Sequence, residues 1–125
     1  GGAGDDHLWS ANGADTLEGG DGADTLFGGS GDDILQGDAG ADIYQFTASS
    51  GNDTIKGYDA SEDTLVFFYR GAQHTSDINE LSLTNGTLTW ASGDQGQSVT
   101  ILLDGITSDN LNDLGAINFT SIDII

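Results

Sequence analysis

Residues 1–45 read GGAGDDHLW SANGADTLE GGDGADTLF GGSGDDILQ GDAGADIYQ, which are five nine-residue units without a gap. The fourth residue of every unit is Gly and the sixth is Asp. The eighth is Leu in the first four units and Tyr in the fifth. Three regular positions kept over five consecutive copies predict a repeat architecture, in which every unit forms the same structural element.

Each regular position fits one part of a turn followed by a strand. Gly permits positive φ angles, which let a tight turn direct its carbonyl oxygens towards one point. The Asp adds a carboxylate beside these carbonyls. This set of oxygen donors suits Ca²⁺, which takes about six to eight oxygen ligands in flexible geometry, better than Mg²⁺, which requires a stricter geometry. The last three residues, such as Thr16, Leu17 and Glu18, alternate polar, apolar, polar. This alternation predicts a short strand that buries its middle side chain, so turn and strand together make half a coil.

The charge of the chain requires a counterion. The 125 residues include 21 acidic and two basic residues, Lys56 and Arg70, for a formal charge of -19. This charge disfavours binding to nucleic acid and to anionic membranes. Two carboxylates about 5 Å apart repel by roughly 3 kcal/mol at an effective dielectric of ~20, so a compact fold needs a cation. Regularly placed apolar residues argue against disorder, and the length predicts one compact unit.

The absence of certain residues and motifs argues against disulfide-bonded, membrane-spanning and enzymatic proteins. The chain has no Cys, and no apolar run approaches the ~18 residues of a membrane span. The Gly-rich start lacks a classical signal peptide. His7 and His74 have no second His at helical spacing, and neither a zinc-protease nor a phosphate-loop motif is present. The repeat explains paired acids such as Asp32–Asp33, so we expect no catalytic residues and no enzyme activity in this region.

The pattern resembles the RTX, or haemolysin-type, calcium-binding repeat, G-G-x-G-x-D-x-U-x with U a large apolar residue. The resemblance implies an all-β fold, a right-handed parallel β-roll in which each turn stacks on the turn two repeats later and holds Ca²⁺ between them. Three ions would then lie between the turns of Asp6 and Asp24, of Asp15 and Asp33, and of Asp24 and Asp42. The implied metal-binding residues are Gly2, Gly4, Asp6, Ala11, Gly13, Asp15, Gly19, Gly20, Asp21, Gly22, Asp24, Gly28, Gly29, Ser30, Gly31, Asp33, Gly37, Ala39, Gly40, Asp42, Asp53 and Asp63.

The repeat departs from the family pattern at two turns and then degenerates. Ser10–Ala11 and Asp38 replace glycines in the first two positions, which strains these turns or weakens a site. Residues 48–56 and 58–66 keep the Asp and the apolar position but lose most glycines. Asp53 and Asp63 either close further sites with Asp33 and Asp42 or cap the roll through ordinary hydrogen bonds. The expected number of calcium ions is therefore three to five.

The two outer faces of the roll differ in character. If odd and even repeats lie on opposite sheets, Trp9 lies beside Phe27 with Ile43 nearby, whereas the other face carries residues such as Glu18 and Lys56. We hypothesise that the C-terminal segment, an upstream domain or a partner covers the aromatic face. The alternative is exposed aromatic residues that are simply favoured in strands.

After Val66 the repeat gives way to a predicted cap, so we divide the chain into a roll (1–66) and a C-terminal capping β segment (67–125) within one compact unit. Strands are expected at Thr64–Arg70, Glu80–Thr84, Thr87–Trp90 and Ser98–Leu103, with an Asn85–Gly86 hairpin between the second and third. A helical turn is expected at Asn110–Leu114 and a last strand at Ala116–Phe119. This half should seal the open end of the roll and shield its edge.

The C-terminal half resembles the region that follows the repeats in RTX exoproteins such as serralysin-type proteases and alginate epimerase modules. The resemblance rests on residues 52–55 and 59–63 and on Asp123–Ile124–Ile125, which is similar to the uncleaved signal of type I export. It implies the C-terminal domain of an exported bacterial protein, secreted, extracellular and monomeric. Its partners would be an upstream domain of the same polypeptide and the type I secretion apparatus. A polysaccharide-binding module or the end of an adhesin are the alternatives.

Overall fold

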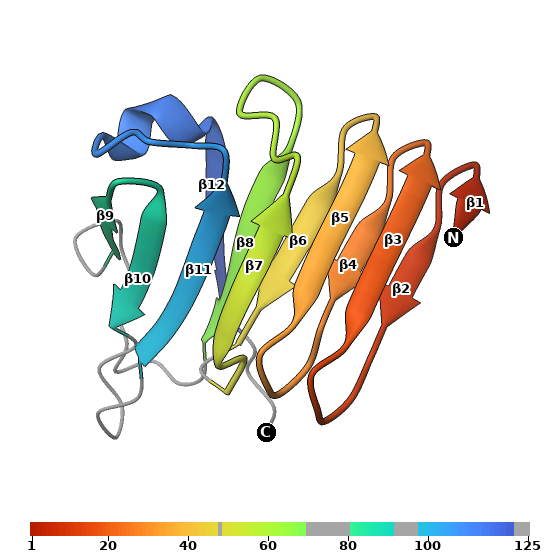
Figure 1. The fold of residues 1–125 in the computed structure, drawn as a ribbon, viewed down its shortest axis with the longest axis horizontal. Helices are drawn as coiled ribbons and strands as arrows, with labels where there is room; N and C mark the ends of the chain where they lie inside the picture. The colour runs from red at the N-terminus through yellow and green to blue at the C-terminus, as the bar shows by residue number, and fades with distance from the viewer. Residues whose placement is uncertain (48, 70–80, 92–97, 122–125) are drawn as a thin grey trace.

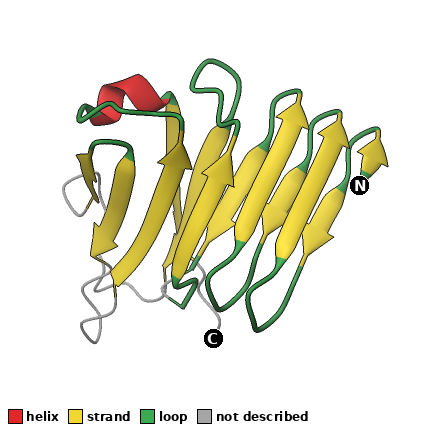
Figure 2. Ribbon diagram, viewed as in Figure 1, coloured by secondary structure: helices red, strands yellow, loops and turns green. Residues whose placement is uncertain are grey.

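The computed structural model describes residues 1–47, 49–69, 81–91 and 98–121. The described chain is almost entirely β-strand, with a single short 3₁₀ helix at Leu111–Leu114, drawn in red in Figure 2. The strands form a seven-stranded and a five-stranded sheet. Among these residues no helix has the length and apolar character needed to cross a membrane. The predicted fold class, an all-β parallel roll with a β-rich C-terminal part, is confirmed.

Successive repeats alternate between the two sheets, as predicted. The first sheet takes β1 (Gly2–Ala3), β3 (Thr16–Asp21), β5 (Ile34–Ala39) and β7 (Asn52–Lys56). The second takes β2 (His7–Trp9), β4 (Thr25–Phe27), β6 (Ile43–Phe46) and β8 (Thr64–Tyr69). All neighbouring strands within these two sets are parallel, so the chain climbs one tier with every second repeat (Figure 1).

The strands of the first sheet are longer than the predicted three residues. β3 and β5 each contain six residues, because the opening residues of the next repeat stay extended and continue the pairing. Gly20 thus pairs with Gly2 in one tier and with Asp38 in the next. The sheet therefore includes residues that the sequence pattern assigned to turns.

The eighth residue of each repeat forms the core. In the second sheet Leu8, Leu26, Tyr44 and Leu65 stand in register, and in the first sheet Leu17, Leu35, Ile55 and Leu103 do so. Except for Leu8, at the first tier, all of these side chains are buried. The two columns face each other and form one continuous hydrophobic cluster, which confirms the prediction that each short strand buries its middle side chain.

The C-terminal strands agree with the predicted elements. They are β9 (Leu81–Thr84), β10 (Thr87–Ala91), β11 (Ser98–Asp104) and β12 (Ala116–Ser121). β9 and β10 form the expected two-residue hairpin, with φ of 48° at Asn85 and 76° at Gly86. Asn110 caps the 3₁₀ helix through its side chain. Arg70 and Glu80, the ends of two predicted strands, lie outside the described residues.

The C-terminal half extends both sheets instead of lying across the end of the roll. β11 pairs in parallel with β7, and β12 pairs in parallel with β8. The β9–β10 hairpin joins the outer side of β11, so β9 and β12 are the last strands at this end of the two sheets among the described residues (Figure 1). The core continues into this half through Phe67, whose ring centroid lies 5.6 Å from that of Phe46 and 5.0 Å from that of Trp90. β8 itself crosses the predicted boundary between residues 66 and 67.

The spacing of the tiers leaves no room for side chains at several turn glycines. Gly2 and Gly20 occupy the same repeat position with φ of 116° and 111°, a region that favours glycine. A Cβ on Gly20 would overlap the carbonyl group of Gly2, whereas a Cβ on Gly2 would meet nothing. The glycine pattern thus reflects both backbone conformation and the close approach of consecutive tiers.

We predict that Gly20→Ala destabilises the protein more than Gly2→Ala. Both variants carry the cost of a positive φ, roughly 1–2 kcal/mol. Only Gly20→Ala also forces two tiers apart, which should add about 1–3 kcal/mol. Urea unfolding in calcium-containing buffer measures both losses, and equal losses would contradict the close packing of the tiers.

Candidate metal sites

The sixth residue of each repeat links its turn to the turn directly beneath it. The backbone N–H of Asp6 donates to Oδ1 of Asp24 at 2.7 Å, and that of Asp24 donates to Oδ1 of Asp42 at 2.9 Å. On the other side of the roll the N–H of Asp15 donates to Oδ1 of Asp33 at 2.8 Å. The structure therefore pairs the same turns that the resemblance implied.

The two degenerate repeats continue this ladder. Oδ1 of Asp53 accepts the N–H of Asp33 at 2.9 Å, and Oδ1 of Asp63 accepts the N–H of Asp42 at 3.0 Å. The separation in sequence grows from 18 residues in the regular tiers to 20 and 21 in these pairs. The extra residues are absorbed in the turns, so the aspartates keep their place.

The turns lie in two rows along opposite edges of the roll (Figure 1). We call the row that contains Asp6, Asp24, Asp42 and Asp63 the odd edge, because it belongs to the odd repeats. The row that contains Asp15, Asp33 and Asp53 is the even edge. Each edge is a file of stacked loops, and each loop presents one carboxylate to its neighbour.

The second carboxylate oxygen is the distinctive feature of these turns. The Oδ2 atoms of four aspartates are buried and have no hydrogen-bond partner within the described structure, namely those of Asp6, Asp24, Asp33 and Asp42. The last three residues are only 1% exposed. Buried charged oxygens without a partner are strongly unfavourable, so a bound cation is the expected compensation.

Backbone carbonyls surround these oxygens. A Cβ on Gly22 would overlap the carbonyl group of Gly4, and a Cβ on Gly31 would overlap that of Gly13. A Cβ on Gly40 would likewise overlap the carbonyl group of Gly22. The carbonyls at the fourth position therefore face the next tier. Near the Asp24 carboxylate, a Cβ on Gly19 would meet both Oδ2 of Asp24 and the carbonyl oxygen of Gly37. No three acidic or histidine side chains converge anywhere in the described ranges, so a metal here must take backbone oxygens as well.

The first position of the repeat is glycine for a related reason. A Cβ on Gly19, Gly28 or Gly37 would overlap the carboxylate of the Asp in the same repeat. The cradle of carboxylate and carbonyl oxygens exists only because these side chains are absent. An all-oxygen donor set of this kind fits Ca²⁺, whose coordination is flexible in geometry.

Some of the predicted ligand residues already take part in hydrogen bonds between tiers. The carbonyls at the third position accept backbone N–H groups, in the pairs Asp21 with Gly4, Ser30 with Gly13, and Ala39 with Gly22. The carbonyl of Ala11 accepts the N–H of Ser30 at 2.7 Å. These carbonyls hold the tiers together, and each keeps a second lone pair.

The two departures from the repeat behave differently. Asp38 adopts φ of 72°, so it keeps the glycine-like conformation of its turn, whereas Ala11 does not adopt a positive φ. The Ser10 hydroxyl donates to Oδ2 of Asp15. At the far end of the odd edge, Oδ2 of Asp63 accepts the N–H of Asp59 at 2.7 Å. Sequence reasoning did not identify these two internal donors, although serine at a glycine position was a signal for the first.

Burial also changes the acidity of the last aspartates. Desolvation, partly opposed by the hydrogen bond from the Asp33 N–H, raises the pKa of Asp53 to about 7 from an ordinary value of 3.8. Desolvation raises the pKa of Asp42 and of Asp63 in the same direction. The charged form of these groups is therefore disfavoured unless a cation is present.

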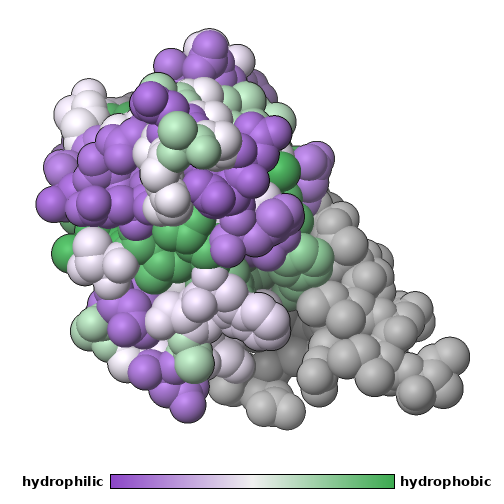
Figure 3. Space-filling model, turned by 90° about the vertical axis from the view of Figure 1, so that its right-hand side faces the viewer, coloured by the Kyte–Doolittle hydropathy of each residue, from purple (hydrophilic) through white to green (hydrophobic). Residues whose placement is uncertain are grey.

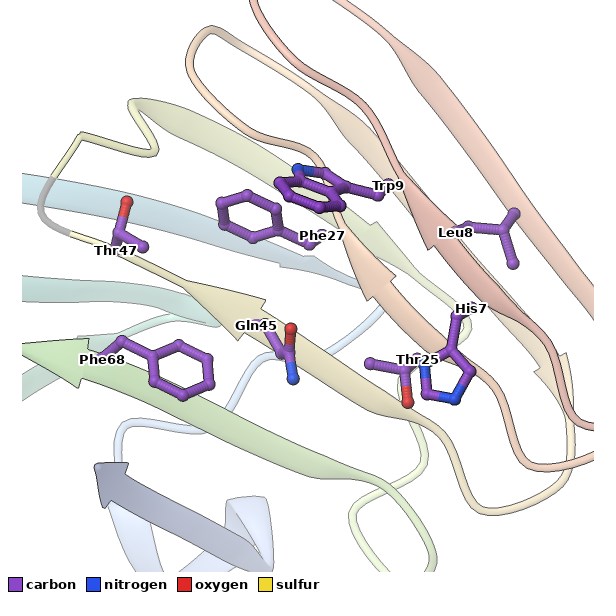
Figure 4. Close-up of a pocket in the computed structure, with 8 residues that line it drawn as sticks. All are labelled: His7, Leu8, Trp9, Thr25, Phe27, Gln45, Thr47 and Phe68. Atoms are coloured by element: carbon purple, nitrogen blue, oxygen red, sulfur yellow. The ribbon is translucent and has the colours of Figure 1, made fainter. Parts of the chain in front are cut away.

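The outer face of the second sheet carries exposed aromatic side chains. Trp9 is 82% exposed, and its ring centroid lies 6.1 Å from that of Phe27. They border an apolar groove of about 310 Å³, which Figure 4 shows with its lining residues His7, Leu8, Trp9, Thr25, Phe27, Gln45, Thr47 and Phe68. Seen from the β1–β2 end, a hydrophobic band runs between the polar turns (Figure 3). The described C-terminal residues leave this face open, so the idea that this segment covers it is wrong for them.

The candidate residues outside these features add no catalytic arrangement. His7 is exposed on the rim of this groove, and His74 lies outside the described residues. On the opposite outer face Glu18, Gln36 and Lys56 stand in register, as expected from the alternation of repeats.

Comparisons with known proteins agree with this geometry. The family model of the RTX calcium-binding nonapeptide repeat (four copies) matches residues 1–17, 9–44 and 45–62. Among curated proteins none matches the sequence significantly.

Two solved structures are similar to the chain. The extracellular lipase LipA from Serratia marcescens is 30% identical with a TM-score of 0.47, over 90% of this chain and 19% of the lipase. The AlgE6R3 subunit from the Azotobacter vinelandii mannuronan C5-epimerase is 24% identical with a TM-score of 0.32, over 88% of this chain and 78% of that subunit. The chain thus spans about a fifth of the lipase.

The family match coincides with the stacked turns, the aspartate ladder and the buried carboxylate oxygens. Residues 1–62 of this chain belong to the family of RTX calcium-binding nonapeptide repeats.

Proposed function

We propose that this chain is a non-catalytic calcium-binding module that folds when it reaches calcium outside the cell, and that its folding supports the secretion and stability of an exported protein. The observation that carries the proposal is the set of four buried Oδ2 atoms without a hydrogen-bond partner. These atoms lie in turns that are otherwise completely ordered by hydrogen bonds between tiers. A bound cation would satisfy these oxygens.

Asp6, Asp24, Asp33 and Asp42 would hold Ca²⁺ together with fourth-position carbonyls such as those of Gly4, Gly13 and Gly22. The bound ion supplies positive charge, which offsets the repulsion between stacked carboxylates. Asp53 extends this arrangement on the even edge, while Asp63 has both oxygens occupied by N–H groups. Of three to five ions, we therefore favour the lower numbers.

Calcium supply then decides whether the chain folds. Extracellular calcium modules commonly bind with dissociation constants of about 10⁻⁴ to 10⁻³ M. At calcium ~100 times the dissociation constant, each independent site stabilises the fold by about 2.7 kcal/mol. A few such sites equal the whole stability of a small domain, ~5–15 kcal/mol. The chain would remain extended in the calcium-poor cell interior during type I export and fold outside.

The module would work within a longer polypeptide. An upstream domain of the same chain is the expected partner, and the roll (1–66) would act with its capping segment (67–125) as one unit. The shared core and the pairing of β11 with β7 and of β12 with β8 support a single cooperative unit.

Binding of a neutral glycan is a second candidate function. The aromatic rings of Trp9 and Phe27 border the groove, and Thr25, Gln45 and Thr47 supply hydrogen-bonding groups there (Figure 4). Flat aromatic surfaces with polar groups beside them suit the apolar faces and hydroxyls of sugar rings. The net charge of -19 opposes polyuronates such as alginate unless calcium bridges them.

We predict that Asp24→Asn raises the calcium concentration at the folding midpoint more than Asp6→Asn. Asp24 belongs to two rungs of the odd edge, whereas Asp6 belongs to one, and the Asn side chain still accepts the N–H of Asp6. The expected shift for Asp24→Asn is roughly tenfold, or about 1.4 kcal/mol.

Far-ultraviolet circular dichroism during calcium titration measures these midpoints. Asp104→Asn, at an exposed position, serves as the control and should leave the midpoint unchanged. Equal shifts for Asp6 and Asp24 would contradict the stacked sites. Full β-structure in excess EGTA at neutral pH would contradict the proposed function itself.

We predict that, in EGTA, lowering the pH from 8 to 5 partly restores the β-structure. The folded state holds the pKa of Asp53 near 7, above the 3.8 of the open chain, so it binds more protons in this window. The free energy of unfolding therefore increases as the pH falls from about 7 towards 3.8, and this contribution is lost as the pH rises through about 7. Circular dichroism against pH tests this, and Asp53→Asn should flatten the curve. A signal that decreases on acidification would exclude this contribution.

We predict that neutral β-linked hexasaccharides shift the fluorescence of Trp9 to shorter wavelength, whereas alginate hexasaccharides do not. Trp90 is completely buried, so the change reports on Trp9. Trp9→Thr should abolish the shift, and Glu18→Thr on the opposite face should retain it. The absence of a shift with every neutral glycan would remove this candidate function.

A further inference from the structure

Among the five regular repeats, one turn, which lies on the even edge, differs from the others at its first position. In repeats one, three, four and five the first position is glycine, and in the second repeat it is Ser10. At each of the four glycines a Cβ would overlap the carboxylate of the same repeat. Ser10 therefore places its side chain in the space that Oδ2 occupies in the other four turns.

The hydrogen bonding of Asp15 differs accordingly. The Ser10 hydroxyl donates to Oδ2 of Asp15. Asp33, on the next tier of the same edge, keeps a buried Oδ2 without a partner in the described structure and is 1% exposed. Asp15 itself is only partly buried. Its N–H still donates to Oδ1 of Asp33, so the ladder is intact and only the second oxygen has changed its partner.

We propose that the Ser10 hydroxyl replaces calcium as the partner of Asp15, so that the gap between the Asp15 and Asp33 turns binds calcium more weakly than the first two gaps of the odd edge. This inference rests on the proposed function. A neutral hydroxyl donates one hydrogen bond but adds no positive charge, so it satisfies the oxygen without neutralising it. The Cβ of Ser10 also takes the space that the carboxylate fills in the glycine-led turns, so the Asp15 carboxylate cannot adopt the same position.

The consequence is an asymmetry between the two edges. Along the odd edge the Oδ2 atoms of Asp6, Asp24 and Asp42 are buried and have no hydrogen-bond partner within the described structure. Both turns that border each of the first two gaps can therefore offer a carboxylate oxygen to an ion. Along the even edge the first gap is occupied from one side by a hydroxyl. Calcium should therefore fill these two gaps of the odd edge first, and the Asp15–Asp33 gap should fill only at higher concentration.

The test compares Ser10→Gly with wild type by isothermal titration and by native mass spectrometry across a calcium series. Ser10→Gly restores the repeat pattern. We expect the dissociation constant of the weakest calcium-binding step to fall roughly tenfold, which corresponds to the free energy of one hydrogen bond to a charged group. Ser10→Ala removes the hydroxyl but keeps the Cβ, so it should tighten that step less.

Asp38→Gly is the matched control, because it also restores a glycine of the repeat. Asp38 has φ of 72° and its carboxylate accepts a hydrogen bond from the side chain of Gln36. This variant should change thermal stability but not the affinity of the weakest step.

Identical binding curves for wild type and Ser10→Gly would overturn the inference, while leaving a calcium-dependent wild type and the proposed function intact. A wild type that binds no calcium would refute the proposed function first. Tightening by Asp38→Gly as strong as that by Ser10→Gly would also overturn the inference, because relief of backbone strain would then explain both.

Discussion

Each tier of the roll is tied to the next by one carboxylate oxygen, which accepts a backbone N–H from the turn 18 to 21 residues earlier. This hydrogen bond orients the whole side chain, because Oδ1 is held by the neighbouring turn. Oδ2 then lies inside its own turn, and in Asp24, Asp33 and Asp42 this atom has no hydrogen-bond partner within the described structure. The same contact that stacks the turns therefore creates the demand for a cation.

The glycine pattern follows from this arrangement. First-position glycines leave room for the carboxylate, and second- and fourth-position glycines allow the carbonyls of the lower tier to approach. Replacing these residues would both strain the backbone and fill the cradle. Most of the constraint on which residues this sequence can use thus comes from the turns at the edges of the roll. The core requires only one apolar side chain in each strand of the repeats.

The electrostatics and the function depend on one another. Tiers bring carboxylates close together in a chain of charge -19, which makes the stacked state unfavourable without counterions. The core of Leu, Ile and aromatic columns is narrow, so it offers limited compensation. In the function proposed above, such a chain folds where divalent cations are abundant. The continuous sheets connect the repeats directly to β11 and β12.

Sequence alone determined the features that arise from local spacing. The nine-residue period predicted the buried columns that include Leu26 and Leu35. The resemblance to the RTX repeat implied the alternation of sheets and the pairing of Asp24 with Asp6 and Asp42. The Asn85–Gly86 turn determined the hairpin. Each of these depends on residues in one repeat, in the adjacent tier or in a short turn, so the pattern contains the necessary information.

Only the tertiary structure decided how the non-repetitive half is attached and how individual turns differ. The pairing of β11 with β7 and of β12 with β8 depends on which sheet edges remain open, and no local pattern encodes that choice. The hydroxyl of Ser10 meets Asp15, and the Tyr58 hydroxyl donates to the Leu114 carbonyl, because folding brings their elements together. Contacts of this kind depend on three-dimensional proximity, which a repeat spacing does not record.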